Sequence, residues 1–377
     1  MSFFSKKERS SVALIDISSS SIAGGLAHLE SGAPPTLYYT LRLPVALRDS
    51  EEIAEAMKRT LVELTEQLVK IGSPILRKET GNGHITRILT SVGAPWQATS
   101  VRTESITALQ PFVFTRALLT ETTRKNQPTL DGFTQSGEAV IATLLNGYEM
   151  ANPFGKKVKR AELIILSSLL EKTVAESVEK TIRKTYHTHA LTLTAFAPVA
   201  YAVFRDVYPH EKNFLVLNVS GETTDIAFIK QGLLVSVTSM PQGINELTRR
   251  ARKAAQVPEN SSPSVNLIVD AEPSNARFDA QVEEAQKEWL SALSATLQEF
   301  ASHHALPRTL FLLADDESRN YLKNLIDEPA LRTLWLTDEP LTIVPSIPSH
   351  FAAYVKTRGE AESDLSLFLL ALFSNRN

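Results

Sequence analysis

Two hydroxyl-rich turns, each lying between apolar runs, carry residue types that bind phosphate. The first turn lies in residues 16–20 (DISSS) and the second in residues 218–225 (NVSGETTD). Serine and threonine hydroxyls, and the backbone N–H groups of a tight turn, donate hydrogen bonds to phosphate oxygens. A carboxylate beside them can hold Mg²⁺. The two turns therefore predict a phosphate clamp, provided that the fold brings them face to face.

The strands around these turns form an internal repeat. Residues 12–23 (VALIDISSSSIA) and residues 215–227 (LVLNVSGETTDIA) each contain an apolar strand, an Asp or Asn, a small polar turn, and Ile-Ala at the start of a second strand. The copies are separated by far more than the period of a solenoid. The repeat therefore predicts two related domains, each of which supplies one hairpin.

Helices must cover these strands. Apolar residues at spacings of three and four predict amphipathic helices over residues 53–71, 171–186 and 282–301. Residues 85–170 read as strands with one helical stretch, and residues 257–275 have loop composition around a short strand. The pattern predicts α/β layers in two similar domains, with a smaller insertion in the first half.

Composition limits the class of protein. The 377 residues exceed the size of one hydrophobic core, and the formal net charge of -3 gives no reason to expect nucleic acid as a partner. The chain has no cysteine, which excludes disulfides and thiolate metal sites. Neither a secretory leader nor a membrane-spanning run is evident, so we expect a soluble, cytoplasmic protein. His187 and His189, like His303 and His304, lack carboxylates at metal-ligand spacing, so we expect no metal site.

The paired hairpins, together with residues 146–157 (NGYEMANPFGKK), resemble the actin-like ATPase superfamily, in particular the branch of the bacterial cell-division protein FtsA and the type IV pilus assembly protein PilM. The resemblance extends through nearly the whole chain in order. Residues 3–22 are most similar to the PilM type, whereas residues 146–168 are more like the 1C insertion of FtsA. The resemblance implies duplicated actin-like, ribonuclease H-like α/β domains with an inserted SHS2-like α+β subdomain.

This resemblance divides the chain into four subdomains. Their expected ranges are 1A (1–84 and 171–208), 1C (85–170), 2A (209–247 and 305–377) and 2B (248–304).

The resemblance also implies that ATP with Mg²⁺ would lie between the hairpins. The residues that would contact it are Asp16, Ser18, Ser19, Ser20, Asn218, Ser220, Gly221, Thr223, Thr224 and Asp225.

Four positions depart from the family pattern. Asn218 stands where the family has an aspartate that holds hydrated Mg²⁺, and Glu222 stands where it has a glycine that lets backbone approach the phosphates. Residues 315–317 are acidic in place of the Gly-Gly turn beside adenosine, although acids there also suit the start of a helix. No Asp, Glu, Asn or Gln lies in residues 181–205 to position an attacking water. These departures predict an inefficient ATPase with no catalytic residue.

We therefore expect a cytoplasmic actin-like scaffold that docks partner proteins of a membrane-associated machine. Self-association of this scaffold is a further expectation. The resemblance implies an insertion that mediates protein contacts, and, for the pilus relative, a groove that takes the cytoplasmic N-terminal peptide of an inner-membrane protein. Phe3, Phe4 and the nearby cations predict only weak or indirect membrane contact. Type IV pilus assembly and cell division both stay open. The alternatives are an ATP-binding, self-assembling ATPase switched by nucleotide, and a small-molecule kinase of the same superfamily.

Overall fold

The computed structural model describes residues 9–48, 50–186, 190–256, 268, 276–335 and 341–376. His187 and His189, the expected short strand near residue 267, and Phe3 and Phe4 lie outside these ranges.

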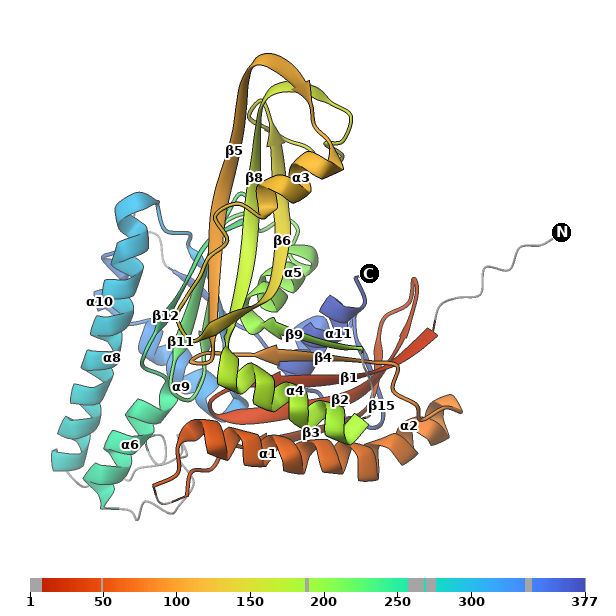
Figure 1. Cartoon of the computed structure of the whole chain (residues 1–377). Coiled ribbons are helices and arrows are strands. Elements are labelled where there is room, and N and C mark those ends of the chain that lie inside the picture. The colour runs from red at the N-terminus through yellow and green to blue at the C-terminus, as the bar shows by residue number, and fades with distance from the viewer. Residues whose placement is uncertain are drawn as a thin grey trace.

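Within the described residues, the strands form three sheets (Figure 1). The six-stranded sheet has the order β15-β3-β2-β1-β4-β9, with β1 (Arg9–Ile17), β2 (Ser21–Glu30), β3 (Thr36–Pro44), β4 (Arg87–Val92), β9 (Leu191–Ala195) and β15 (Lys356–Glu360). The five-stranded sheet has the order β12-β11-β10-β13-β14, with β10 (Phe214–Val219), β11 (Thr224–Lys230), β12 (Leu233–Met240), β13 (Thr309–Leu313) and β14 (Thr342–Pro345). The four-stranded sheet has the order β5-β8-β6-β7, with β5 (Gln97–Val113), β6 (Phe133–Leu145), β7 (Tyr148–Glu149) and β8 (Lys157–Glu171).

The first two sheets repeat one topology. β1 is antiparallel to β2 and parallel to β4, which is parallel to β9. β10 is likewise antiparallel to β11 and parallel to β13, which is parallel to β14. The central strands β1 and β10 are mostly apolar, because both faces of each mixed sheet are covered. The duplicated α/β architecture predicted from the sequence is therefore confirmed.

Helices cover the outer face of the six-stranded sheet and the outer face of the five-stranded sheet, and further helices lie between these two sheets. On the first sheet they are α1 (Ile53–Gln67), η1 (Leu68–Gly72), α2 (Ser73–Thr80) and α4 (Lys172–Tyr186). On the second sheet they include α6 (Ile244–Ala255), α8 (Ala276–His303), α9 (Asp316–Ile326) and α10 (Pro329–Arg332). Between the sheets, α5 (Phe196–Val207), η2 (Pro348–Phe351) and α11 (Leu365–Ser374) share one core with strands of both. This shared core fixes how the two hairpins face each other.

The first long helix runs further than its sequence suggests. A helix ending near Gly72 was expected from residues 53–71, but the chain continues through the π-helical turn η1 into α2. Gly72 has helical backbone angles and so does not end the helix. Its missing side chain permits close packing, since a Cβ there would lie 2.7 Å from Tyr39 and 2.9 Å from Leu26. Pro74 is tolerated because it lies in the first turn of α2.

The four-stranded sheet stands away from the other two, with α3 (Arg116–Thr123) against it (Figure 1). It begins later than the sequence predicts, because β4 is a buried strand between β1 and β9 and belongs to the first sheet. The end of the chain also differs from the expected ranges. β15 pairs with β3, and the apolar α11 packs in the shared core, so residues 356–376 contact the first sheet. No helix among the described residues has the length and apolarity needed to cross a bilayer.

Candidate functional site

The two hydroxyl-rich turns have the same backbone geometry. In the first, the N–H of Ser18 donates to the carbonyl of Ser21 at 3.0 Å, and in the second, the N–H of Ser220 donates to the carbonyl of Thr223 at 2.9 Å. The strand register matches as well, because Asp16 pairs with Ala23 across the first hairpin in the way that Asn218 pairs with Asp225 across the second. The hairpins can therefore be compared position by position.

The tips of the two hairpins contact each other directly. The hydroxyl oxygens of Ser19 and Ser220 are 3.1 Å apart, and the backbone N–H of Glu222 donates to the Ser19 hydroxyl at 2.9 Å. Gly221 lies so close to the first turn that a Cβ on it would be 3.0 Å from backbone atoms of Ser19 and Ser20. A hydroxyl and an N–H that could bind phosphate are thus bonded to each other across the gap.

The second hairpin is also held from behind by α6. The N–H groups of Ile244 and Asn245 donate to the carbonyls of Ser220 and Gly221, at 3.0 and 2.8 Å. A helix N-terminus with free N–H groups attracts anions, but these two groups are already bonded within the protein. Gly243 makes the approach possible, since a Cβ there would lie 2.3 Å from the Ser220 carbonyl oxygen.

Glu222 folds back onto the same helix. Its carboxylate accepts hydrogen bonds from Asn245 Nδ2 at 2.8 Å and from Arg249 Nη1 at 2.8 and 2.9 Å. The carboxylate of Glu222, at a position where the sequence resemblance leads one to expect glycine, is therefore neutralised by Arg249, and it also suits the positive end of the helix dipole. Its effect is to fix the closed turn rather than to repel a ligand at close range.

Asp16 is buried at the base of the first hairpin, 6% exposed, and accepts a hydrogen bond from Ser91 Oγ at 2.5 Å. Burial raises the pKa of Asp16 above its ordinary value, while the Arg42 charge and the Ser91 bond oppose that rise. This carboxyl is thus satisfied by its own half of the molecule.

Arg42 on β3 is the main cation of the site, and no motif in the sequence points to it. Its guanidinium donates two hydrogen bonds to the Asp364 carboxylate, at 2.8 and 3.0 Å, and donates to the hydroxyls of Ser21 and Ser366 at 2.6 Å each. Asp364 also caps α11 by accepting from the N–H of Leu367 at 3.1 Å. Burial alone would raise the pKa of Asp364, but the charge and hydrogen bonds of Arg42 lower it below its ordinary value.

Asp315 connects Arg42 and the first hairpin to the second half of the chain. Its carboxylate accepts from Ser20 Oγ at 3.1 Å and lies 3.8 Å from Arg42 Nη1. It makes no side-chain capping bond to α9, so a capping role for Asp315 is not what the structure shows. Its neighbour Asp316 pairs instead with Arg319 of the same helix. The acidic turn therefore joins the two halves through serine and arginine.

Beside these contacts lies an interdomain cavity of about 520 Å³. Its charged lining consists of five carboxylates, Asp315, Asp316, Glu317, Glu362 and Asp364, against two guanidiniums, Arg42 and Arg319. A smaller space of about 70 Å³ adjoins the hairpins and is lined in part by Asp16, Ser18, Ser20, Asn218 and Ser220. An excess of carboxylates disfavours an anionic triphosphate, and the space at the hairpins is small.

The remaining expected residues lie elsewhere. Thr223 bonds the Ser220 hydroxyl at 3.0 Å, and Thr224 Oγ1 donates to the Gln242 carbonyl at 2.8 Å. Asp225 accepts from Gln97 at 3.2 Å and from Ser239, and neither Thr224 nor Asp225 lines the two cavities.

Asp225 joins its hairpin to the base of the inserted sheet, because Gln97 begins β5 and Ser239 lies on β12. Burial raises the pKa of Asp225 to about 6, against the lowering effect of these hydrogen bonds. Among the described residues, no group of three or more His, Asp or Glu is arranged to hold a metal ion.

Solved structures share this architecture. A chain of a PilM–PilN type IV pilus biogenesis complex superposes with a TM-score of 0.64 at 14% identity, over 98% of this chain and 99% of that one. A Bacteroides thetaiotaomicron protein with an actin-like ATPase fold and unknown function (8%, TM-score 0.43, 99% of each chain) superposes more loosely. So does the ethanolamine utilization protein EutJ from Carboxydothermus hydrogenoformans (11%, TM-score 0.45, 97% and 90%). The sequence matches no family model and no curated protein. The chain therefore has an actin-like fold, in the form seen in the PilM–PilN complex.

Proposed function

We propose that this chain is an actin-like assembly protein of a type IV pilus machine, which docks partner proteins and does not turn over ATP. The observation that carries the proposal is the hydrogen-bonded contact between Ser19 and the second turn, at the Ser220 hydroxyl and the Glu222 N–H, in a fold shared with a chain of a PilM–PilN complex. Fold alone does not fix function, so the proposal rests on the site together with that likeness.

The contacts within the cleft support the absence of turnover. Phosphate would have to displace the Ser19 bonds, and the first N–H groups of α6 are already bonded to the second turn. Breaking each such bond without an equal replacement costs about 1 kcal/mol or more. Asn218 supplies no charged ligand for Mg²⁺. The same closed contacts hold the two halves in one arrangement, as a scaffold requires.

The partner is an inner-membrane component of the pilus machine, recognised through a short cytoplasmic peptide. The likeness to a chain of a PilM–PilN complex supports this partner, and the projecting sheet β5-β8-β6-β7 offers a long edge strand, β5, to such a peptide. The chain would then work at the inner face of the membrane through its partner. Cell division stands as the other machine, on the sequence resemblance of the insertion.

A nucleotide-switched ATPase is the second candidate, because the cavity of about 520 Å³ between the halves reaches the size range of small-molecule sites. In that case ATP would bind with Mg²⁺ and its triphosphate would part the two turns.

The test is a titration of this chain with the N-terminal peptide of a PilN protein, the partner named in the complex that shares this fold, with and without millimolar Mg-ATP. The scaffold proposal expects micromolar binding that Mg-ATP does not change, and no binding of a scrambled peptide. Binding only in the presence of Mg-ATP would favour the switched ATPase. An absence of binding in both conditions would overturn the pilus assignment.

A further inference from the structure

A groove separate from the two cavities of the cleft lies at the end of the first sheet opposite the hairpins. It has a volume of about 740 Å³ and is formed where the chain passes from α2 to β4. β4 pairs with β1 from Arg87 opposite Val12 to Val92 opposite Ile17, so its first residue is at the end of the sheet away from the turns. This groove shares no residue with the two cavities of the cleft. The groove is therefore a separate site from the cleft.

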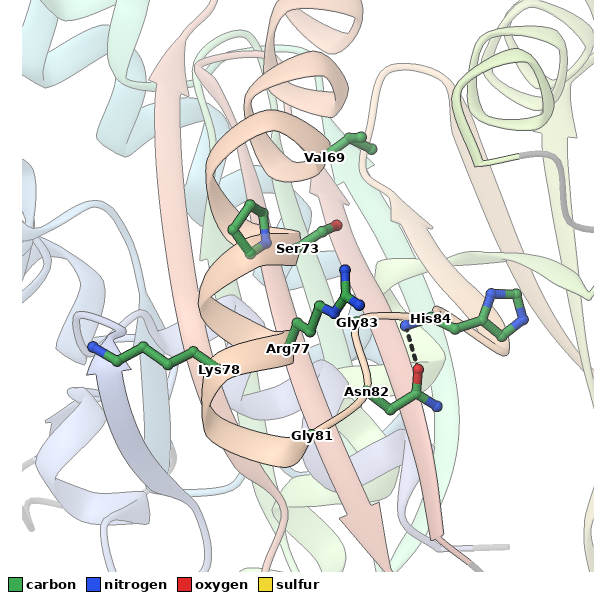
Figure 2. Close-up of a pocket in the computed structure, with 9 residues that line it drawn as sticks. Val69, Ser73, Arg77, Lys78, Gly81, Asn82, Gly83 and His84 are labelled. Atoms are coloured by element: carbon green, nitrogen blue, oxygen red, sulfur yellow. Dashed lines mark hydrogen bonds between the residues drawn. The ribbon is translucent and has the colours of Figure 1, made fainter.

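One wall of the groove is a stripe on the continuous helix. Val69, Ser73 and Arg77 follow each other at intervals of four residues, which places them on one face. Arg77 and Lys78 both line the groove, and Figure 2 shows their side chains diverging from the last turn of α2, with Arg77 directed toward the loop of Gly83 and His84. The helix therefore presents an apolar side chain at one end of the groove and a guanidinium at the other.

The loop after α2 forms the other wall, and its conformation is built in. Gly81 ends the helix with φ +77°, a left-handed conformation that favours glycine. Asn82 Oδ1 accepts from the N–H of His84 at 2.9 Å (Figure 2). A Cβ on Gly83 would lie 3.0 Å from the Ser73 carbonyl oxygen, so the loop packs directly against the helix. The groove is thus a fixed feature of the surface.

The lining of this groove is basic. It contains Arg77, Lys78 and His84, and none of the residues that line it is acidic. In the described part of the chain, neither Arg77 nor Lys78 forms an ion pair. Cations in the last turn of α2 suit the helix dipole, yet that interaction leaves both charges open to a ligand. A ligand of complementary charge would be anionic.

Apolar surface adjoins the cations. The side chain of Val69, which lines the groove, is 38% exposed. A free phosphate would use only the cations, whereas a peptide with acidic and apolar residues would use both. We propose that this groove docks an acidic segment of a partner protein, whose carboxylates pair with Arg77 and Lys78 and whose apolar side chain covers Val69.

The experiment measures the fluorescence anisotropy of a labelled Glu-Glu-Leu-Glu-Glu-Leu peptide titrated with the full chain. We expect saturable binding that weakens as salt rises, because exposed ion pairs are screened. The charge reversal Arg77→Glu with Lys78→Glu should weaken binding on the order of tenfold or more. The neutral pair Arg77→Gln with Lys78→Gln should weaken it less. Lys70→Glu changes an exposed cation that does not line the groove and should leave the affinity unchanged.

Three results would overturn the proposal. The first is equal binding of the matched Gln-Gln-Leu-Gln-Gln-Leu peptide, since the cations would then contribute nothing. The second is unchanged affinity in both Arg77–Lys78 double variants, with circular dichroism melts that match the original chain. The third is an absence of peptide binding, with or without binding of the chain to vesicles that contain anionic lipid. Vesicle binding in that case would identify the surface as a membrane contact. None of these results depends on the pilus partner or on ATP.

Discussion

The two hairpins of this protein share a backbone but hold their carboxylates on opposite strands. The first has Asp16 on its leading strand opposite Ala23, whereas the second has Asn218 on its leading strand opposite Asp225. Asp16 lies beside the small space at the turns and near Arg42. Asp225 lies outside that space and bonds Gln97 and Ser239. The same turn therefore serves the cleft in one half and the inserted sheet in the other.

The hairpins also differ in what supports them. The first turn is braced by its own serine hydroxyls, since Ser18 Oγ accepts from the N–H groups of Ser20 and Ser21. The second turn depends on α6, through the backbone bonds of Ile244 and Asn245. A clamp that opens for ligand would need at least one hairpin to move with little cost. Here the second is tied to a helix and the first is tied to the second.

The largest effect is expected at the support of the second hairpin. Gly243→Ala places a methyl group 2.3 Å from the Ser220 carbonyl oxygen, so the turn and α6 must separate. We expect the free energy of unfolding to fall by about 3 kcal/mol, measured by urea denaturation. Gly137→Ala is the matched control, because nothing lies within 4 Å of a Cβ there. Equal stability of the two variants would show that the second hairpin does not depend on its contact with α6.

The two buried carboxyls should differ in their dependence on pH. Folding raises the pKa of Asp225 from 3.8 to about 6, so its stabilising contribution is complete below pH 3.8 and is lost as pH rises through about 6. We expect Asp225→Asn to remove a decline of about 2–3 kcal/mol between these values, measured by denaturation across pH. Asp16→Asn should remove a decline of the same sign. An unchanged pH profile in Asp225→Asn would contradict the assigned burial.

Loss of Arg42 should weaken the junction between the halves. Arg42→Ala leaves the buried Asp364 without its cation, and because the Arg42 side chain is 33% exposed we discount the loss to about 2 kcal/mol. Arg42→Lys keeps the charge but not the bidentate hydrogen bonding to Asp364, and should recover part of the stability. Full stability of Arg42→Ala in thermal melts would show that the junction does not depend on this network.

The smallest effects are expected from removing single serine hydroxyls. They compare a hydroxyl that bonds between the two hairpins with one that bonds within the first hairpin. Ser19→Ala removes the hydroxyl that accepts from the Glu222 N–H and should cost about 1 kcal/mol. Amide hydrogen exchange at Glu222 should become faster in this variant. Ser18→Ala removes bonds within the first turn only, so exchange at Glu222 should stay unchanged. Faster exchange at Glu222 in both variants would mean that the hairpins are not separately supported.

The sequence predicts the repeated parts of this molecule better than the parts between them. The hairpins and the amphipathic helices follow from local apolar patterns, which depend on neighbouring residues. The grip of Arg42 on Asp364 joins residues 322 apart, and the bond from Gln97 to Asp225 spans 128 residues. Neither pair has a local pattern that could reveal it.

The glycines also show that tertiary contacts cannot be predicted from local sequence. Gly221 was expected at the site because it lies in the motif, whereas Gly243 follows Met-Pro-Gln and looks like an ordinary loop residue. Its importance comes from the approach of α6 to the Ser220 carbonyl, which is set by tertiary packing. Likewise β4 resembles the insertion strands next to it in sequence, and only its pairing with β1 and β9 places it in the first sheet.

The central claim is that the hairpins are closed on each other and do not hold a nucleotide. The most direct test is the melting temperature of the chain with and without millimolar Mg-ATP, since a ligand that binds only the folded state stabilises it by about 2.7 kcal/mol at a hundredfold excess over its dissociation constant. We predict no shift in a protein that melts cooperatively. An upward shift that Asp16→Ala abolishes would contradict the account and make the nucleotide-switched ATPase the better description.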